Sequence, residues 1–340
     1  MILYIGNILS SKRLNPPPIE SIKGKICDSL GKKVILTSNK KNKFLRFLHM
    51  NFVYFWYFRR VSLVFLDVYS TKAFYYTFYF AYLSKVFSLK YIPVIHGGDI
   101  ENRIKKSEWM TNFVFKNGET NITPSIYIES IFKKYNFDTT YIPNCIEFSK
   151  YKFKLRKKIR PKIMWLRSFH EIYNPKMALE VLKILKNTYN DAKLTMVGPE
   201  KDGSLEKCLR LSKRYKLNQK VEFVGYLSKI EWLKIARDHD IFINTSTVDN
   251  MPVSILEMMA LGLPIISTNV GGIPCILKNK KNSLLVNNND FKSMASSIKY
   301  LINDPEYAHK ISMNALNSLK PFSVELVVPQ WIKIIKTVLI

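Results

Sequence analysis

Two acidic residues stand eight positions apart in the stretch TSTVDNMPVSILEMMALGLPII, which covers residues 245–266. Asp249 follows the apolar run DIFINTS, and Glu257 lies in a run with helical periodicity. A carboxylate accepts hydrogen bonds from two adjacent hydroxyls, and the free amides at a helix start bind phosphate. Three interpretations are therefore open: a sugar-nucleotide clamp, a catalytic acid pair, or plain helix capping by Ser254 or Asn250, since Ser254-x-x-Glu257 is also a capping-box pattern. A glycosidase pair is disfavoured, because nothing else in the chain resembles a glycosidase.

The segments that must position these acids alternate between short apolar strands and helices. Continuous apolar strands that alternate with helices indicate parallel sheets covered on both faces. The predicted fold class is therefore α/β with two doubly wound domains, in which ligands bind at the carboxyl ends of the strands, in the cleft between the domains. Strands are predicted at 2–7, 33–38, 61–69, 91–98, 162–167, 192–198, 240–246 and 283–288, and helices at 18–30, 70–89 and 174–185.

The length of 340 residues exceeds the usual size of a single core, so two domains are expected. The segment 150–162 has eight basic residues in 13 and no acid, which suits an exposed connection between domains. We expect a first domain at 1–150, a second at 151–320, and a final helix at 321–340 that packs back toward the first domain.

The composition sets the class of partner and the compartment. Lys and Arg number 53 against 26 Asp and Glu, and the net charge of +27 favours an anionic partner. The four cysteines stand far apart without a C-x-x-C pair, so a zinc site, a redox pair or a disulfide framework is not expected. The first 18 residues do not have the pattern of a signal peptide, and no apolar run reaches the length of about 18 residues that spans a membrane. The expected location is cytoplasmic.

The opening stretch as a whole resembles the carboxyl-terminal signature of the GT4 family of retaining glycosyltransferases. That signature has an acid, seven residues, a glutamate, A-x-G-x-P and a strand, which stand here as Asp249, Glu257, residues 260–264 and IISTNVGGIP. The segments IPNCIEFSKY, KIMWLRSFHEIYNP, LTMVGPEKDG and VEFVGYLS resemble further parts of the family, so that the likeness covers nearly the whole chain. It implies the GT-B fold, two Rossmann-like domains that face each other across a cleft, with the acceptor side in 1–150 and the nucleotide-sugar site in 151–320.

The resemblance also implies roles for single residues. Arg167 would face the donor diphosphate, Asp249 would hold hydroxyls of the donor sugar, Glu257 would take the ribose, and His96 would lie near the donor sugar and the acceptor. These four are the candidate catalytic residues. Further candidates for donor binding are Gly6, Lys176, Gly198, Gly225, Met251, Pro252, Val253 and Ser254, and those on the acceptor side are Gly97, Gly98, Asp99 and Arg103.

The function implied by the resemblance is transfer of a sugar, with retention, from a nucleotide-sugar to a hydroxyl of a glycan or lipid-linked glycan in bacterial cell-surface polysaccharide or lipopolysaccharide synthesis. No cofactor and no metal ion are expected. Two departures are notable: relatives carry a lysine where Ile172 stands, and no second glycine follows Gly6. These departures leave open a non-catalytic homologue that binds a sugar nucleotide or serves as a partner subunit.

A basic and aromatic stretch remains outside this pattern. Residues 29–66 contain no acid and eight Lys or Arg, with Phe44, Phe47, Phe52, Phe55 and Trp56 interleaved. A helix of this composition would lie in a membrane interface with its bases on anionic headgroups, which adds peripheral attachment to the inner face of the cytoplasmic membrane as a hypothesis. The alternative is that the aromatic residues form core and the lysines a solvated face. A nucleic-acid partner is not expected, because no recognition motif appears and the bases are spread over both domains.

Overall fold

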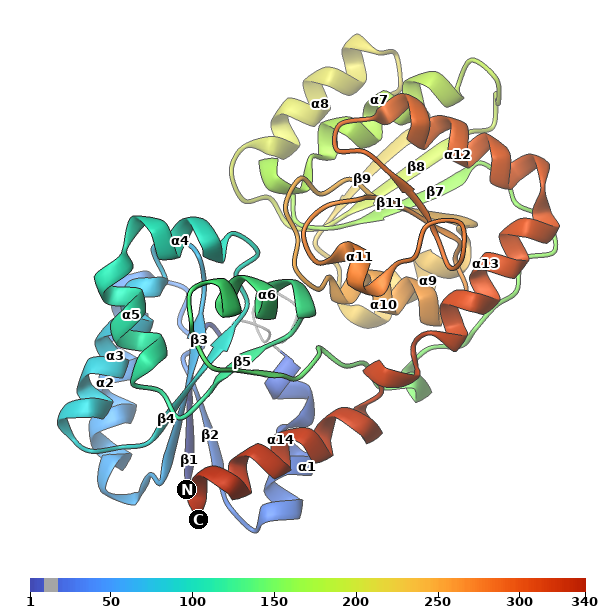
Figure 1. Cartoon of the computed structure of the whole chain (residues 1–340). Coiled ribbons are helices and arrows are strands. Elements are labelled where there is room, and N and C mark those ends of the chain that lie inside the picture. The colour runs from blue at the N-terminus through green and yellow to red at the C-terminus, as the bar shows by residue number, and fades with distance from the viewer. Residues whose placement is uncertain (9–17) are drawn as a thin grey trace. The chain divides into compact units, whose positions relative to one another are not determined.

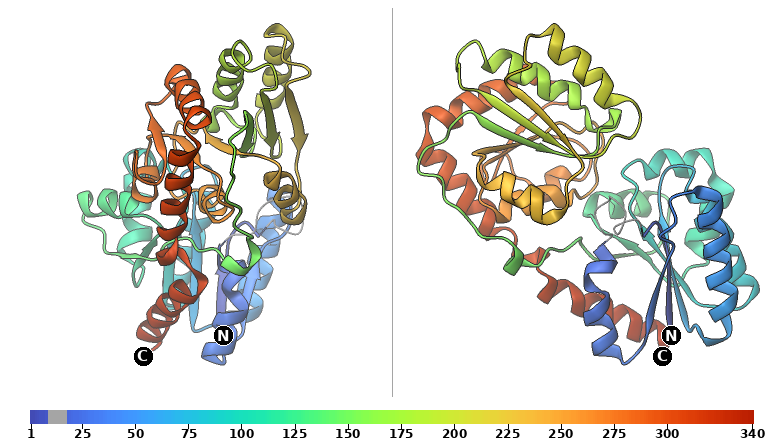
Figure 2. Two further views of the ribbon diagram at one scale, coloured as in Figure 1. Left: turned by 90° about the vertical axis from the view of Figure 1, so that its right-hand side faces the viewer. Right: turned by 180° about the vertical axis from the view of Figure 1, so that it is seen from behind.

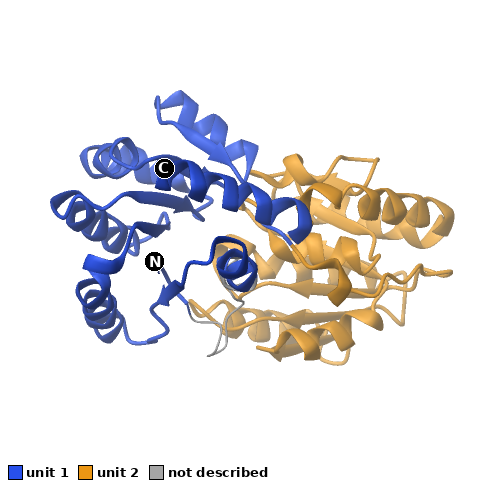
Figure 3. Ribbon diagram, turned by 90° about the horizontal axis from the view of Figure 1, so that it is seen from below, with its two compact units in different colours: residues 1–145, 324–340 blue, residues 146–323 orange. Residues whose placement is uncertain are grey.

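The computed structural model describes residues 1–8 and 18–340, and the chain divides into two compact units. Unit 1 combines residues 1–145 with 324–340, and unit 2 comprises residues 146–323 (Figure 3). Each unit contains one parallel six-stranded sheet with helices on both faces, as the alternating pattern predicts. No helix in the described part of the chain has the length and apolar character needed to cross a membrane.

The sheet of unit 1 has the strand order β2-β1-β3-β4-β5-β6, with all neighbouring strands parallel. Its strands are β1 (Ile2–Ile5), β2 (Val34–Thr37), β3 (Leu63–Val68), β4 (Tyr91–Ile95), β5 (Asn121–Thr123) and β6 (Thr139–Tyr141). Its helices are α1 (Pro18–Leu30), α2 (Lys43–Tyr57), α3 (Phe74–Val86), α4 (Ile100–Lys106), α5 (Glu108–Lys116), α6 (Ile126–Lys134) and α14 (Val324–Leu339).

Two apolar layers cover the faces of this sheet. On one face α2, α3, α5 and α6 pack around Tyr54, Phe80 and Phe115, and on the other face α1 and α14 pack around Ile22 and Trp331 (Figure 1). Successive residues of a strand point to opposite faces, so both faces can be covered only if the strands are apolar throughout. The six residues of β3 are accordingly all buried. The C-terminal helix α14 thus belongs to unit 1, where it lies beside α1 (Figure 2).

The sheet of unit 2 has the strand order β12-β11-β10-β7-β8-β9, again parallel throughout. Its strands are β7 (Lys162–Leu166), β8 (Lys193–Val197), β9 (Val221–Gly225), β10 (Ile241–Asn244), β11 (Ile265–Thr268) and β12 (Leu284–Val286). Its helices are α7 (Pro175–Leu185), α8 (Ser204–Arg214), α9 (Lys229–Arg237), α10 (Val253–Ala260), α11 (Ile273–Ile276), α12 (Phe291–Asn303) and α13 (Pro305–Asn317).

The basic segment 150–162, expected to be an exposed connection, lies within unit 2 and is partly buried. Arg156 is 4% exposed, and its guanidinium donates to the carbonyls of His239 at 2.6 Å and Leu261 at 3.2 Å. Burial lowers the pKa of Arg156 to about 10, an effect that the carboxylate of Asp240 partly offsets. Composition alone indicated exposure because a buried arginine is rare, and this one is accommodated by main-chain carbonyls that the fold supplies.

Candidate functional site

The crevice at the carboxyl ends of a doubly wound sheet lies where the strand order reverses, because the loops diverge there. In unit 2 this position is between β7 and β10, the first strand and its neighbour across the reversal. Arg167 directly follows β7, and Asp249 lies in the loop between β10 and α10. The fold therefore brings together two side chains that are 82 positions apart in the sequence.

Arg167 and Asp249 form an ion pair at this edge of the sheet. Arg167 donates from Nη2 to Oδ2 of Asp249, and Ser246 donates from Oγ to the same oxygen at 3.0 Å. The main-chain amide of Asn250 donates to the other oxygen, Oδ1, at 3.0 Å. The guanidinium also lies over the ring of Tyr173, 4.7 Å from its centroid. The ring contact and the ion pair together position the guanidinium group. Arg167 Nε is nevertheless buried without a hydrogen-bond partner.

Glu257 lies on α10 and is only 4% exposed. Its Oε1 accepts a hydrogen bond from the hydroxyl of Tyr151 at 2.9 Å and one from the ammonium of Lys229 at 3.1 Å. Burial raises the pKa of Glu257, and the Lys229 ammonium partly offsets that effect. The capping-box alternative is not realised, since α10 has no side-chain cap and the hydroxyl of Ser254 is buried without a partner.

Unit 1 carries a second polar cluster at its own strand-order reversal, between β1 and β3. The buried carboxylate of Asp67 accepts from the hydroxyl of Tyr4, from the hydroxyl of Tyr69 at 3.3 Å, and bonds His96 Nε2 at 2.8 Å. Burial, and then the neighbouring Asp67 carboxylate, raise the pKa of both Tyr4 and Tyr69. His96 directly follows β4, and it is thus brought to a carboxylate of the neighbouring strand β3 that the sequence analysis did not single out.

The comparisons with known proteins identify the family. Residues 147–318, about half of the chain, match the family described as glycosyl transferases group 1. The chain belongs to this family. The family expected from the stretch 245–266 is thereby confirmed, and the matched region contains the whole Arg167, Asp249 and Glu257 cluster.

Solved structures of this kind cover the chain from end to end. A sucrose-phosphate synthase from Thermosynechococcus elongatus superposes with a TM-score of 0.82 over 99% of this chain and 98% of its own, at 13% identity. HepE from Anabaena in complex with UDP-glucose superposes with a TM-score of 0.76 over 99% of both chains, at 15% identity. At identities this low, the superpositions establish the fold alone. They confirm the predicted GT-B fold class.

Similarity to curated sequences is more local. A UDP-Gal:α-D-GlcNAc-diphosphoundecaprenol α-1,3-galactosyltransferase from Escherichia coli is 26% identical over 193 residues, which are 52% of this chain and 48% of that protein. The chain spans about half the length, or less, of the curated relatives it matches.

Glycines shape the loops around the cluster of this group 1 family member. A side chain on Gly198, which has a φ of +152°, would overlap the carbonyl of Arg167. The Gly198 amide donates to the carbonyl of Gly225 at 2.7 Å, so the loop after β8 is joined to the end of β9. Gly271 and Gly272 lie against the main chain of the loop that carries Asp249 in the same way. These positions require glycine because two stretches of main chain meet there.

The remaining donor-side candidates differ in what their side chains can offer. The side chain of Met251 is buried in the apolar cluster of unit 2, and that of Val253 is partly buried against it, so neither offers a polar side-chain contact. Pro252 is the N-cap residue of α10 and has no amide hydrogen. Ser254, with its unpartnered hydroxyl, is the one side chain of this group that is poised for a polar contact.

The structure does not bring Lys176 to the cluster. Its ammonium is exposed and pairs with Glu180 on the same helix at 3.5 Å. The cation beside Glu257 is instead Lys229, the first residue of α9, whose start is held by a capping box between Ser228 and Glu231. Sequence reasoning missed Lys229 and Tyr151, because a lysine in a chain with 53 basic residues and a tyrosine in a basic segment carry no local signal.

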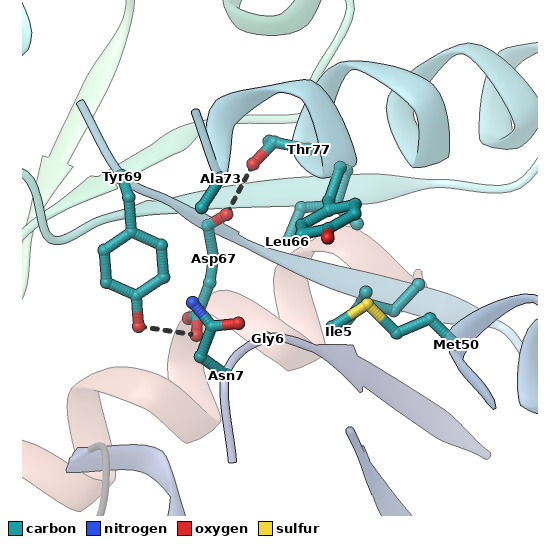
Figure 4. A pocket seen from close by; sticks show the side chains of 10 residues that line it. Ile5, Gly6, Asn7, Met50, Leu66, Asp67, Tyr69, Ala73 and Thr77 are labelled. Carbon is teal, nitrogen blue, oxygen red and sulfur yellow. Dashed lines mark hydrogen bonds between the residues drawn. The ribbon is translucent and has the colours of Figure 1, made fainter. Parts of the chain in front are cut away.

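Figure 4 shows a small pocket in unit 1 at the β1–β3 reversal, lined by Asn7, Asp67, Tyr69, Thr77 and six other residues. Thr77 donates to the main-chain carbonyl of Asp67 at 2.6 Å, and the carboxylate of Asp67 lies against Gly6. Asp67 had a sequence signal that was not used: it is the one acid between residues 29 and 98, and it stands inside an apolar strand.

The acceptor-side candidates have mainly structural partners. Arg103 donates from Nε and Nη2 to the carbonyl of Ser70 at 2.9 and 2.8 Å and lies over the ring of Phe74. A side chain on Gly97 would meet the amide of Ser70, so this glycine too permits a close approach of main chain. Asp99 is exposed at the start of α4, where it accepts from Asn102 at 2.6 Å, and Gly98 precedes it at intermediate exposure. Of the candidates in unit 1, His96 alone joins the buried polar cluster.

Proposed function

We propose that this chain is a retaining, GT4-like glycosyltransferase that moves a sugar, a hexose or a related sugar, from a nucleotide-sugar donor to a hydroxyl of a glycan or lipid-linked glycan. The setting proposed is the synthesis of a bacterial cell-surface polysaccharide. Membership of the group 1 family supports glycosyl transfer, and the acid-x7-glutamate signature supports the retaining subclass by resemblance. The proposal includes no metal ion and no cofactor.

One observation carries the proposal. Among the described residues, four buried side-chain atoms lack a hydrogen-bond partner, and two of them, Arg167 Nε and Ser254 Oγ, belong to the candidate donor site. A buried donor without a partner costs about 1–3 kcal/mol, so a fold retains such groups where a ligand completes them. An arginine fork and the first turn of a helix are both suited to the oxygens of a diphosphate.

The roles follow from the chemistry of these side chains. Arg167 stabilises the charge that develops on the departing nucleotide, and its partner Asp249 accepts hydrogen bonds from hydroxyls of the donor sugar. Glu257 accepts from the ribose, and the Lys229 ammonium partly offsets the effect of burial on that carboxylate. In unit 1, Asp67 holds His96 by its Nε2, which leaves Nδ1 as the ring nitrogen for substrate.

A uridine nucleotide is the donor class to test first. The name of the Escherichia coli relative specifies UDP-Gal as its donor and a diphosphoundecaprenol-linked sugar as its acceptor, and the HepE structure holds UDP-glucose. We extend the donor class and the lipid-linked acceptor to this chain as part of the proposal. A cytoplasmic location with peripheral attachment to the membrane would give the enzyme access to both.

The test is thermal unfolding of the protein with UDP-sugars, GDP-sugars and no ligand. A ligand that binds the folded chain raises the free energy of unfolding by about 2.7 kcal/mol at a hundredfold excess over its Kd. We expect a rise with one nucleotide class, lost in Glu257→Gln and retained in the control Glu206→Gln, which changes an exposed residue of α8. No rise with any nucleotide-sugar would contradict the proposal.

Hydrolysis of the bound donor in the absence of acceptor separates an enzyme from a non-catalytic homologue. The proposed enzyme releases free sugar slowly, and Arg167→Ala abolishes that release. Donor binding without any release, in the presence or absence of glycan acceptors, would favour the sugar-nucleotide-binding subunit instead.

A further inference from the structure

Helix α2 of unit 1 presents an apolar stripe on its outer side. Its six members are 44% to 67% exposed. Four of them stand at positions 44, 48, 52 and 56, four residues apart, and the other two stand next to these, at 45 and 55. This spacing places all six along one side of the helix. The opposite side of α2 is buried against the sheet through Met50, Val53 and Tyr54. We name the stripe the α2 ridge: Phe44, Leu45, Leu48, Phe52, Phe55 and Trp56.

Helix α3 runs alongside α2 and supports the ridge. Phe47 packs on the ring of Tyr79 at 5.1 Å toward one end of the two helices, and Phe55 packs on Phe87 at 6.0 Å toward the other. The hydroxyl of Tyr79 also donates to Asn51 Oδ1 at 2.7 Å. These contacts join α2 to α3 at several points along its length, and Figure 1 shows the two helices side by side.

The stretch of sequence that forms the ridge and its flanks carries exposed charge of one sign. Between residues 29 and 98 the only acid is Asp67, which is 5% exposed and bonded within the polar cluster. Exposed bases stand at both ends of α2: Lys40 and Lys41 precede it, Lys43 is its first residue, and Arg59 and Arg60 follow it. An apolar stripe bounded at both ends by cations matches an anionic layer with an apolar interior.

We propose that the α2 ridge docks on an anionic lipid bilayer. The helix lies in the plane of the membrane, its aromatic and leucine side chains enter the boundary between headgroups and acyl chains, and the bases at its two ends contact lipid phosphates. At 15 residues, or about 22 Å, α2 is too short to span the bilayer, which fits a helix lying on its surface. The inference deepens the membrane attachment included in the proposed function and names the surface that makes it. No residue of either polar cluster belongs to the ridge, so it can be tested separately from the transfer reaction.

Other occupants fit the surface less well. A second copy of the chain, packed by a two-fold axis across antiparallel α2 helices, would set the bases at one end of α2 against those at the other end. A nucleic acid would use the bases but would leave Leu45 and Leu48 exposed. A bilayer satisfies both the apolar and the cationic part of the surface.

The experiment is co-sedimentation with vesicles of phosphatidylcholine, with and without 30 mol% phosphatidylglycerol. The full chain is expected to bind the anionic vesicles and to bind the neutral ones far more weakly. Each base near an anionic surface contributes about a factor of five to binding, so Arg59→Glu with Arg60→Glu is expected to weaken it by about 30-fold or more. Phe52→Ser with Trp56→Ser is expected to weaken binding by at least about tenfold, because two inserted side chains are lost.

Matched controls lie in unit 2. Leu209→Ser with Met313→Ser removes two exposed apolar side chains, and Lys157→Glu with Lys158→Glu reverses two adjacent exposed bases. Both double variants are expected to bind within about twofold of the native chain. Unfolding temperatures measured without ligand check the fold of the ridge variants, whose replaced side chains are mostly exposed.

Three results would overturn the proposal. The first is that the native chain does not bind anionic vesicles, and the second is that the control variants lose as much binding as the ridge variants. The third is a concentration-dependent dimer in sedimentation velocity that Phe52→Ser with Trp56→Ser abolishes, which would assign the ridge to a second copy of the chain. A nucleotide-sugar still raises the unfolding temperature of the ridge variants if the proposed function holds, so the two proposals fail separately.

Discussion

Arg167 donates to Asp249 across the ends of two adjacent parallel strands, β7 and β10. The pair lies where the strand order of unit 2 reverses, and Tyr173 and Ser246 fix it from two sides. Because Nε of the guanidinium remains unpartnered and buried, the arginine is held in place by its carboxylate while still carrying a donor for a ligand. In the proposed donor site, this arrangement would require arginine and no other cation.

Arg167→Lys tests that requirement. Lysine keeps the charge but loses the planar fork, so it cannot serve Asp249 and a phosphate at once. A charge-assisted hydrogen bond contributes about 1.5–3 kcal/mol, so we expect donor affinity to fall by about tenfold to hundredfold in calorimetric titration. Arg210→Lys, at an exposed pair with Glu206, is the control and should leave affinity unchanged. Equal affinities of the native chain and Arg167→Lys would remove Arg167 from the donor site.

Glu257→Gln tests the effect of burial on a single carboxyl. Burial raises the pKa of Glu257 above the ordinary value of 4.5, so the folded chain binds the proton more tightly than the unfolded chain. The contribution of this group to stability is therefore fully present below pH 4.5 and is lost as the pH rises through the raised pKa, by at most about 1.4 kcal/mol per pH unit.

Glutamine does not titrate, so the stability of the native chain relative to Glu257→Gln should decrease as the pH rises from 4.5. Urea unfolding of both proteins between about pH 4.5 and pH 8 measures this difference. Parallel curves for the two proteins, or a difference that grows in the other direction, would contradict the shift.

Gly6→Ala tests whether the first loop is shaped by the Asp67 carboxylate. An added methyl group at Gly6 would overlap that buried carboxylate and displace it from Tyr4 and His96. We expect a loss of about 1–3 kcal/mol in the free energy of unfolding. Gly24→Ala is the matched control: it lies within α1 with open space around it, and should stabilise the fold by about 0.5–1 kcal/mol. Two changes of the same sign would show that Asp67 does not restrict Gly6.

Arg156→Met tests the buried arginine of the basic segment. The change leaves Asp240 and several carbonyls with fewer partners in an apolar environment, so we expect a loss of about 3–5 kcal/mol, measured by denaturant unfolding. Asp240 retains its pair with Arg160, which sets the loss toward the lower end of that range. Lys157→Met, one position on and exposed, should change stability by less than about 0.5 kcal/mol. A similar small effect of both changes would show that Arg156 is dispensable to unit 2.

The two sheets and their order of elements follow from the sequence because the signals are local. Apolar runs such as 61–69 and 240–246 are readable as strands buried on both faces, and the strands formed, β3 and β10, lie within those ranges. The signals for the helix ends are also local: α1 begins at Pro18, and Gly262 follows the end of α10. The family is local as well, since a stretch of about 30 residues carries its signature, and the match over 147–318 confirms it.

The composition of a segment was a poorer guide than its pattern. Residues 150–162 indicated an exposed connection, but the fold buries Tyr151, Arg156 and Ile159 of that segment in unit 2. Charged residues are normally exposed, and only the carbonyls of His239 and Leu261, brought from distant parts of the chain, make the burial of Arg156 possible. The sequence carries no mark of that arrangement.

The sequence by itself determined the fold class and the family, and it singled out Arg167, Asp249 and Glu257 as the centre of the candidate site. Only the tertiary structure decided their partners. Lys229 rather than Lys176 reaches the buried carboxylate, Tyr151 comes from 106 positions away, and Asp67 takes His96 and encloses Gly6. The physical reason is that a local pattern specifies which way a strand or a helix faces, whereas a polar contact depends on the order in which strands are placed in the sheet. That order brings together loops that the chain separates by dozens of residues.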